Sequence, residues 1–447
     1  MAGKLFGTDG IRAIANTYPL TVEFCTKLAI VLSRQICTRQ KAVLIARDTR
    51  ISGQMLFSAL SAGFLSQGIK VFDIGIVPTP LCTTLTPKYN VDMSIMITAS
   101  HNPYKDNGLK LINAQGDKFS DEQTALIEKL MSEPLTDNDN PQNIGEIIEV
   151  PQTANHYLEN VKKIAPSDAL KGMKIALDAA NGSFAEILAS VFRYLGAEII
   201  SLGDKPNGKN INENCGSQHT ETLSQTVVDR RYDMGIAVDG DGDRIIICDE
   251  NGKRLDGDQI IAYLATYLKK HNLLKGNAVV STVYSNLGLG KYIRSLGLEH
   301  YASAVGERYV IEKMREVGSN LGGEESGHMV LSDYAKTGDA LYAAVIVSLG
   351  IKESSQKLSE IFPVFKPFPS ESRNLRFDNK DIIEKIMSAT EVKEKIAFIS
   401  ERLKGHGVIL VRKSGTEPVI RLKIEDEDEQ TARSEMASLE ECIKSIA

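Results

Sequence analysis

The chain has 447 residues and a formal net charge of −6, from 52 Lys and Arg against 58 Asp and Glu, and 42% of its residues are hydrophobic. Because domains average roughly 100 to 200 residues, this length predicts three or four of them, each with an adequate core. The acidic balance argues against nucleic acid as a partner, and the lack of a targeting segment or a bilayer-length apolar run predicts a cytoplasmic protein without membrane contact.

Short apolar runs alternate with helix-like segments through most of the chain, which is typical of α/β domains with parallel or mixed sheets. The first such unit ends in polar, turn-rich residues that predict a linker at about 135–152. The elements predicted before this linker are strands at 42–46, 70–74 and 93–97 and helices at 54–66 and 122–131.

The same succession recurs twice, so the architecture is predicted to repeat, although the copies have no visible residue-level identity. From about residue 367 a smaller unit follows, closed by an amphipathic helix with Ala432, Met436, Leu439 and Ile443 on its apolar face. The elements predicted in these units are strands at 173–178, 197–202, 234–238, 245–248, 278–282, 301–305, 373–377, 407–412 and 419–424, and helices at 184–195, 258–271, 289–296 and from after 377 to about 398.

Ser100 follows an apolar run at 93–97 and enters a turn built from His101, Asn102 and Pro103. A serine hydroxyl is a weak nucleophile that needs an adjacent base or a stored activated group. No Gly-x-Ser-x-Gly elbow or His–Asp partner set accompanies this serine, so acyl-transfer hydrolysis is poorly supported.

Asp239, Asp241 and Asp243 stand in a glycine-containing loop between two strand-like runs. Their mutual repulsion is relieved when they converge on a hard cation, and phosphate oxygens and water commonly complete the coordination of Mg²⁺. With Glu250 they also match EF-hand ligand positions, but Arg244 stands where that motif needs glycine, and strands replace its helices. We therefore predict a magnesium loop, with a calcium loop or a solvated acidic turn as alternatives.

A Gly- and Glu-rich stretch at 322–328 precedes the apolar residues 329–331. Its Glu324, Ser326 and His328 side chains offer a carboxylate, a hydroxyl and an imidazole, which together suit the hydroxyls of a sugar. Taken alone, such a stretch is more often an ordinary turn.

Residues 412–418 connect two predicted strands of the last unit. Arg412, the Ser414 and Thr416 hydroxyls and the backbone around Gly415 make a compact anion cradle. The stretch lacks the spacing of a P-loop, so it does not indicate nucleotide binding there. A solvated hairpin tip is the alternative.

Three further cations have the chemistry of a phosphate site. Arg12 lies on a glycine-permitted turn, Lys110 follows Ser100 by ten residues, and Arg244 directly follows the aspartate loop. A guanidinium fork suits phosphate oxygens. Arg12 and Lys110 can equally be surface cations.

Four of these stretches are distinctive in combination: Thr98-Ala-Ser-His-Asn-Pro103, Asp239-Gly-Asp-Gly-Asp-Arg244, Gly323-Glu-Glu-Ser-Gly-His328 and Arg412-Lys-Ser-Gly-Thr-Glu-Pro418. Their order and spacing resemble the α-D-phosphohexomutase family over essentially the whole chain. The resemblance implies an α/β protein with four domains around a central cleft, three similar α/β domains with mixed sheets and a smaller α+β C-terminal domain. The expected domains, which carry the phosphoserine, metal, sugar and phosphate loops in turn, are 1–150, 151–255, 256–368 and 369–447.

The resemblance implies that Ser100 carries a phosphoryl group, gives it to the 1- or 6-hydroxyl of a hexose monophosphate, and recovers one from the resulting bisphosphate. His101 or Lys110 is implied as a candidate for the general acid and base, without a choice between them. The implied catalytic residues are Ser100, His101, Lys110, Arg12 and Arg244. The implied ligands of one Mg²⁺ per site are Ser100, through its phosphate, and Asp239, Asp241 and Asp243. The implied substrate-binding residues are Glu307, Glu324, Ser326, His328, Arg412, Ser414, Gly415 and Thr416.

Shorter stretches at 4–12, 14–20 and 305–310 look like the branch of the family that interconverts glucosamine 6-phosphate and glucosamine 1-phosphate. The phosphomannomutase/phosphoglucomutase branch is the alternative, and a non-catalytic phosphosugar- or calcium-binding protein is a third. Two positions depart from the branch pattern, because Ala13 replaces a glycine and Glu307 replaces an aspartate near the sugar. The resemblance further implies a supply of UDP-N-acetylglucosamine for peptidoglycan precursors, activation by glucosamine or glucose 1,6-bisphosphate, and a homodimer.

Overall fold

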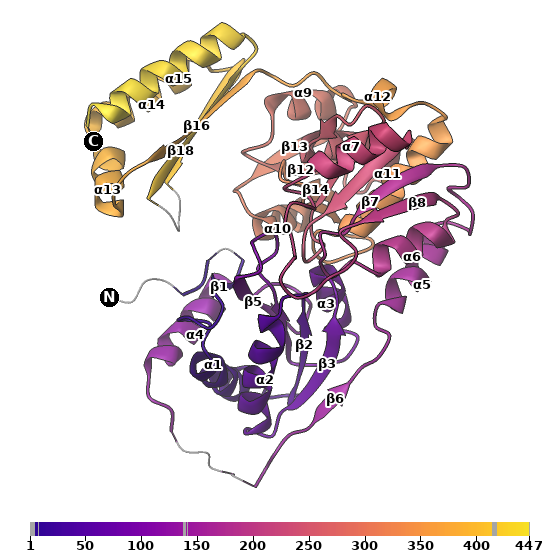
Figure 1. Cartoon of the computed structure of the whole chain (residues 1–447). Helices are drawn as coiled ribbons and strands as arrows, with labels where there is room; N and C mark the ends of the chain where they lie inside the picture. Colours follow the sequence, from indigo (N-terminus) through magenta and orange to yellow (C-terminus); the bar gives the residue numbers. More distant parts are fainter. Residues whose placement is uncertain (1–4, 8, 137–139, 141, 414–417, 447) are drawn as a thin grey trace. The chain divides into compact units, whose positions relative to one another are not determined.

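The computed structural model describes residues 5–7, 9–136, 140, 142–413 and 418–446, with residue 380 lacking a described side chain. These residues form two compact units, and Figure 1 labels many of their elements. Unit 1 comprises Met1–Thr282 and Tyr301–Val364, and unit 2 comprises Val283–His300 and Phe365–Ala447. None of the helices in the described part of the chain combines the length and the hydropathy that a membrane crossing requires.

The first sheet of unit 1 has six strands. The elements around it are β1 (Ile11–Ile14), α1 (Val22–Gln35), β2 (Ala42–Arg47), α2 (Ser52–Leu65), β3 (Lys70–Ile76), α3 (Thr79–Leu85), β4 (Met93–Ile97), β5 (Asp106–Asn113), α4 (Asp121–Ser132) and β6 (Ile147–Glu149). The strand order is β1-β5-β4-β2-β3-β6, in which β5 is antiparallel to both of its neighbours. The β-branched runs of β2 and β4 are almost wholly buried, as expected for central parallel strands covered on both faces.

The second sheet of unit 1 has five strands in the order β11-β10-β9-β7-β8. Its elements are α5 (Asn155–Ile164), β7 (Lys174–Asp178), α6 (Ile187–Tyr194), β8 (Glu198–Leu202), α7 (Glu221–Arg230), β9 (Met234–Val238), β10 (Ile245–Asp249) and β11 (Arg254–Leu255). Strands β7, β8 and β9 are parallel, whereas β10 pairs antiparallel with β9. This sheet is therefore mixed, like the first.

A third sheet has four strands in the order β13-β12-β14-β15. The elements of this part of the chain are α8 (Gly257–Lys270), β12 (Ala278–Thr282), β13 (Glu299–Ser303), α10 (Glu307–Val317), β14 (Leu321–Gly323), β15 (Met329–Leu331), α11 (Ala340–Ser354) and α12 (Leu358–Ile361). Strand β14 is parallel to β12 and antiparallel to β15.

Four strands recur in one order in these three sheets, as β5-β4-β2-β3, β10-β9-β7-β8 and β15-β14-β12-β13. In each sheet the first two strands of this series are an antiparallel pair. The connection between them carries Ser100 in the first sheet, residues 239–243 in the second and residues 324–328 in the third. Three of the sequence motifs thus occupy one equivalent position in three repeated sheets.

Unit 2 contains a three-stranded antiparallel sheet in the order β16-β18-β17. Its elements are α9 (Leu287–Ser295), β16 (Ser370–Arg376), α13 (Lys380–Ser388), α14 (Thr390–Arg402), β17 (Gly407–Lys413), β18 (Val419–Asp426) and α15 (Glu429–Lys444). The predicted apolar face of the last helix is correct, because Ala432, Met436, Leu439 and Ile443 are all buried in the core of this unit.

Two predicted segments differ from the structure. The expected linker at 135–152 contains β6, which pairs parallel with β3 at the edge of the first sheet. The single helix expected to end near 398 is two helices, because the backbone becomes extended at Ala389. The predicted mixed sheets and α/β class are confirmed, whereas the domain boundaries stay predictions.

Candidate active site

Ser100 lies three residues beyond the end of β4 and is buried. Its backbone has a φ of 52°, in the left-handed region that non-glycine residues seldom adopt. Its N–H donates to Thr98 Oγ1 over 2.9 Å, and its carbonyl accepts from Arg50 Nη2 at 3.0 Å and from Asn212 Nδ2 at 2.8 Å. The loop therefore presents the hydroxyl in one fixed direction.

Arg50, which the sequence analysis missed, holds this loop in place through hydrogen bonds to its carbonyl oxygens. Its guanidinium also donates to the carbonyl oxygens of Asn102, at 2.8 Å, and Pro103. Its Nε pairs with Asp48 Oδ2 at 2.9 Å, and both side chains are fully buried. Burial raises the pKa of Asp48, although Arg50 opposes the shift. The five-donor fork of arginine suits several carbonyls at once, which a lysine could not reach.

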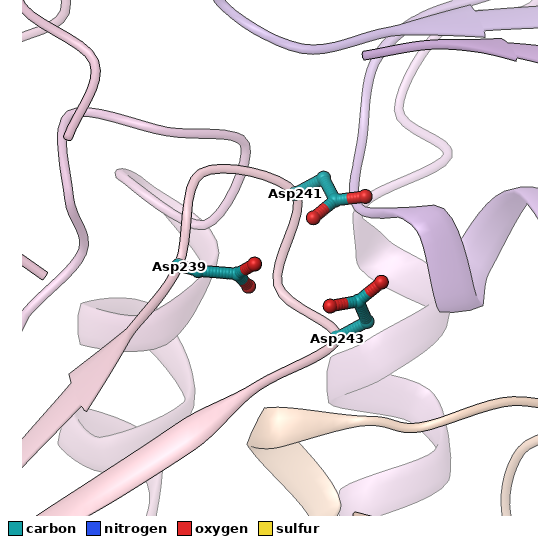
Figure 2. A group of neighbouring side chains, drawn as sticks. All are labelled: Asp239, Asp241 and Asp243. Atoms are coloured by element: carbon teal, nitrogen blue, oxygen red, sulfur yellow. The ribbon is translucent and has the colours of Figure 1, made fainter. Parts of the chain in front are cut away.

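Figure 2 shows the carboxylates of Asp239, Asp241 and Asp243 turned toward one another in the loop between β9 and β10. All three are buried, and each offers an oxygen that lies within 4.8 Å of the others. Asp239 Oδ2 accepts from Ser100 Oγ at 2.7 Å, which joins the first two motifs. The turn requires Gly242, whose φ is 75° and where a Cβ atom would approach Phe184 to 2.3 Å.

This triad fits a divalent cation. Asp241 Oδ1 is buried and has no hydrogen-bond partner among the described residues. Burial, together with Asp243 and Asp241, raises the pKa of Asp239 to about 8, a repulsion that a cation would relieve. Glu250, the twelfth position of the EF-hand alternative, instead accepts from the backbone N–H of Ser359 at 3.1 Å. The EF-hand arrangement is therefore not formed, because its twelfth ligand position faces Ser359.

Lys110, on β5, reaches the same aspartates. Its Nζ lies 2.8 Å from Asp241 Oδ2, 3.0 Å from Asp243 Oδ2 and 3.1 Å from Asp9 Oδ2. Although burial opposes the charge, these carboxylates hold the pKa of Lys110 well above its ordinary value. Arg12, on β1, pairs with Asp9 at 2.6 Å. The structure thus brings both predicted cations to the edge of the triad.

His101 and Arg244 flank the serine and the triad. His101 Nδ1 lies 3.3 Å from Ser100 Oγ. Burial and the nearby Arg244 and Arg12 guanidinium groups lower the pKa of His101 to about 3, so its ring is neutral at physiological pH. Arg244 Nε is buried, lacks a hydrogen-bond partner among the described residues, and lies 4.0 Å from Asp243 Oδ1. An unsatisfied guanidinium N–H beside the triad suits an anionic oxygen.

The third loop is tied to the aspartates through His328. The ring nitrogens of His328 lie 3.0 Å from Asp243 Oδ1 and 3.0 Å from Glu324 Oε2. Although burial opposes the charge, Asp243 leads the interactions that raise the pKa of His328 to about 10. Glu324 also accepts from the Gly306 N–H at 3.0 Å, whereas Ser326 is exposed. The three motifs of unit 1 therefore meet, and Ser326 remains open to solvent.

Glu307, at the start of α10, is buried with partners at both carboxylate oxygens. Oε1 accepts from Thr337 Oγ1 and from the Gly338 N–H. Oε2 pairs at 2.6 Å with Lys118, which also pairs with Asp9. Lys118 was not predicted, because its partners lie far away in the sequence. It joins Glu307 to the network around Lys110.

The fourth motif lies in unit 2. Arg412 Nε donates to the Tyr284 hydroxyl at 3.0 Å, and its guanidinium lies over that ring at 4.9 Å from the centroid. Ser414, Gly415 and Thr416 lie outside the described residues. Their predicted contribution to a phosphate site stays a prediction.

Models of one protein family match most of the chain. They describe the alpha/beta/alpha domains I, II and III of phosphoglucomutase/phosphomannomutase, at residues 3–137, 155–252 and 256–368, and its C-terminal domain at residues 374–441. The chain belongs to the phosphoglucomutase/phosphomannomutase family. As a phosphohexomutase it is an isomerase, as the sequence predicted.

Full-length relatives of this phosphohexomutase include a phosphoglucosamine mutase of Paramagnetospirillum magneticum, 42% identical with 100% of both chains covered, and one of Zymomonas mobilis, 43% identical with 96% of both covered. Among solved structures, a phosphoglucomutase/phosphomannomutase family protein from Burkholderia thailandensis has a TM-score of 0.82 at 22% identity, over 100% of this chain and 98% of the other. An Aspergillus fumigatus N-acetylphosphoglucosamine mutase, solved with GlcNAc-6P and magnesium, has a TM-score of 0.66 at 16% identity, over 100% and 96%. The predicted phosphohexomutase fold is confirmed.

Proposed function

We propose that this phosphohexomutase interconverts glucosamine 6-phosphate and glucosamine 1-phosphate, as the names of its full-length relatives suggest. Ser100 would carry the phosphoryl group and pass through a glucosamine 1,6-bisphosphate intermediate. The observation that carries this proposal is the 2.7 Å hydrogen bond from the Ser100 hydroxyl to Asp239 of the buried triad. A serine fixed against a cation-binding triad suits a phosphoryl carrier, because phosphoryl transfer depends mainly on positioning and charge stabilisation.

Asp239, Asp241 and Asp243 would hold one Mg²⁺, which when bound supplies neutralisation of the charge on a phosphorylated Ser100. The free Nε of Arg244 faces this region and can donate to a phosphoryl oxygen. The phosphoryl group leaves Ser100 for the sugar hydroxyl, and the proton of that hydroxyl passes to a base.

Two residues are the candidates for this general base and for the general acid. His101 is a candidate by position, because its Nδ1 lies 3.3 Å from Ser100 Oγ. Lys110 is a candidate because its Nζ lies 2.8 Å from Asp241 Oδ2 at the edge of the triad. In the second half-reaction the bisphosphate, after turning over, returns its other phosphoryl group to Ser100.

The remaining assignments also belong to the proposal. Glu324, Ser326 and His328 would bind the sugar, with Glu307 beside them, and the 412–416 loop would hold the distal phosphate. The product would serve UDP-N-acetylglucosamine and peptidoglycan precursor synthesis in the cytoplasm. Activation by glucosamine or glucose 1,6-bisphosphate and a homodimer are further parts of it.

Intact-mass measurement tests the carrier. The purified chain should contain a population heavier by one phosphoryl group, and Ser100→Ala should lose both that mass and nearly all turnover. Ser58→Ala, an exposed serine on α2, is the matched control and should retain both. Undiminished mutase activity in Ser100→Ala would falsify the carrier role.

Initial rates test the substrate. Glucosamine, glucose and mannose 6-phosphates are compared, each with a trace of the matching 1,6-bisphosphate. We expect the highest kcat/KM with glucosamine 6-phosphate. A clear preference for mannose or glucose phosphate contradicts the glucosamine assignment and favours the alternative phosphomannomutase/phosphoglucomutase specificity.

A further inference from the structure

Unit 1 contains a cavity of about 700 Å³ that none of the predicted catalytic, metal or sugar residues lines. Its walls come from the ends of α3, α5 and α8, from α11, and from residues 332–336, which follow β15. Helices α3, α5 and α11 are labelled in Figure 1. The volume falls within the range of roughly 300 to 1,000 Å³ that is usual for small-molecule sites.

Positive charge gathers on this cavity. Lys88, Lys163 and Lys336 line it at its exposed rim, and the described residues give none of them a carboxylate partner. Lys88 Nζ instead lies 2.9 Å from His156 Nε2, and Lys163 Nζ lies 3.3 Å from Asn160 Oδ1. Partial burial lowers the pKa of Lys88, and the nearby charge of Lys163 lowers it further.

The only carboxylate on the lining among the described residues does not balance these lysines. Asp333 pairs with Lys275 at 2.6 Å through Oδ1 and accepts from Asn320 Nδ2 at 2.9 Å through Oδ2. Both oxygens are therefore engaged elsewhere. In a chain with a net charge of −6, a cavity with three unbalanced lysines selects an anion.

The rest of the lining is aromatic and aliphatic. Tyr267, Tyr334 and Tyr342 line it beside Ile346 and Leu349. The rings of Tyr334 and Tyr342 lie 5.5 Å apart and are tilted by 30°. Tyr342 is only 2% exposed, so the half-buried rings of Tyr334 and Tyr267 present the surface on which a further planar ring can pack. Aromatic side chains of this kind stack on nucleic-acid bases without sequence preference.

The wall of the cavity is joined to the active site by hydrogen bonds. Asp339 accepts from the Tyr342 N–H at 3.2 Å and from the Tyr157 hydroxyl at 3.0 Å. The two preceding residues, Thr337 and Gly338, both donate to Glu307. A ligand that shifts Tyr334, whose ring packs on Tyr342, therefore acts on the segment that orients Glu307.

We propose that this cavity is an effector site for a nucleotide, whose phosphates contact Lys88, Lys163 and Lys336 and whose base stacks on the tyrosines. Occupancy alters the KM of the mutase through residues 337–339. This site is distinct from the active site, and the proposal does not depend on which sugar the enzyme uses.

Calorimetric titration of the full chain tests the site with four probes: ADP, CDP, pyrophosphate and adenosine. ADP and CDP should bind, whereas pyrophosphate and adenosine should bind at least about tenfold more weakly, because each lacks one half of the contacts. Lys88→Glu combined with Lys163→Glu should weaken ADP by about tenfold or more. Lys162→Glu, the adjacent exposed residue of α5 that does not line the cavity, is the matched control and should leave ADP binding unchanged.

Kinetics complete the test. Saturating ADP should change the KM for the hexose phosphate at least about twofold in the wild type and in Lys162→Glu. The double variant should keep normal kinetics without ADP and lose the response. Tyr334→Ser should weaken ADP but not pyrophosphate.

Three results would overturn the proposal. Equal ADP affinity in the wild type and the double variant places the nucleotide elsewhere. If pyrophosphate binds as tightly as ADP, the tyrosines contribute nothing to binding and no base stacks on them. ADP binding that leaves KM unchanged removes the coupling to Glu307.

Discussion

The backbone of Ser100 is held in a left-handed conformation by groups from three separate segments. Such a conformation costs a non-glycine residue roughly 1 kcal/mol or more and persists only where the surroundings impose it. Arg50 is the largest of these groups, because it donates to the carbonyl oxygens of Ser100, Asn102 and Pro103 together. The direction of the hydroxyl thus depends on a residue that takes no part in the chemistry.

Arg50→Lys tests this dependence. Lysine keeps the charge beside Asp48 but cannot satisfy the carbonyls that the guanidinium fork reaches, so buried oxygens lose their donors. We expect kcat to fall at least about tenfold and the free energy of unfolding to fall by about 2 kcal/mol. Steady-state rates and urea unfolding measure both.

Arg39→Lys serves as the control, since Arg39 is exposed. Both quantities should stay at wild-type values in that variant. Wild-type turnover in Arg50→Lys would show that the Ser100 loop does not need the fork.

A second residue-scale prediction concerns the metal. Asp241→Asn should weaken Mg²⁺ binding at least about tenfold, because a neutral amide replaces one of the three carboxylates. Glu250→Gln should leave it unchanged, since Glu250 faces Ser359. Calorimetric Mg²⁺ titration of the three proteins distinguishes the triad from a loop in which Glu250 is a ligand. Activity should disappear with a chelator and return with Mg²⁺.

Individual residues of the site were predictable only where one motif carries them. Ser100 and the three aspartates each stand in a contiguous motif, so the sequence alone predicted a serine site and a metal-binding loop. Arg50, Asn212 and Lys118 were not, because they act on partners 50, 112 and 189 positions away, respectively. Only the fold creates those contacts.

Among the elements, α11 begins with a carboxylate in an unusual state. Burial raises the pKa of Asp339 to about 7, while this residue caps the helix by accepting from Leu341 and Tyr342. The folded chain therefore holds a proton that an unfolded chain, with a carboxyl pKa near 4, has released. This contribution to stability is full below about pH 4 and is lost as the pH rises through about 7.

Asp339→Asn should remove this pH dependence. Between pH 5 and pH 7, the decline in the free energy of unfolding should be smaller by about 2 kcal/mol than in the wild type. Asp428→Asn, which alters the exposed cap of α15, is the control, because a hydrogen bond from Thr431 lowers rather than raises the pKa of Asp428. Parallel slopes for the wild type and Asp339→Asn in urea unfolding would contradict a protonated Asp339.

Helix α10 is fixed at its first residue by the Lys118–Glu307 pair. Removing either partner leaves a buried charge, so Lys118→Met and Glu307→Gln should each cost about 3 kcal/mol of stability. The double variant should cost at least about 1 kcal/mol less than the sum of the single variants. Strict additivity in urea unfolding would mean that the pair is not coupled.

The pattern of the elements explains which of them were predicted. Continuous apolar strands such as β4 and β9 were found, because central strands are buried on both faces. Strand β6 was missed, since its three residues have no clear alternation and are defined by the neighbouring edge of β3. The break at Ala389 carries neither glycine nor proline, so no local signal marked it.

At the level of the whole molecule, the second unit has a core of its own. That core includes Leu375, Ile399, Ile424 and Leu439, all from unit 2. Units with separate cores can unfold in separate steps. The four-domain organisation was predictable from length and motif order, whereas the grouping of 283–300 with unit 2 was not, because it depends on packing between distant segments.

Scanning calorimetry should therefore resolve more than one transition. Leu439→Ala creates a cavity in unit 2 and should lower one transition by about 10 °C or more, because replacing a buried leucine by alanine costs about 2 to 5 kcal/mol. Leu60→Ala, in the core of the first sheet, should lower a different transition. A single transition that both variants shift equally would contradict independent unfolding.

The antiparallel strand pair that recurs in the three sheets of unit 1 separates the common scaffold from the loops that differ between the copies. Each copy supplies one loop at the same place, so the scaffold can be conserved while one loop changes its residues and the other two keep theirs. Residues 324–328 can therefore differ without rebuilding the loops of Ser100 and the aspartates, provided that His328 still meets Asp243. Repetition of one supersecondary unit thus supplies three loops at one equivalent position, and the Ser100–Asp239 and His328–Asp243 contacts join them in one site.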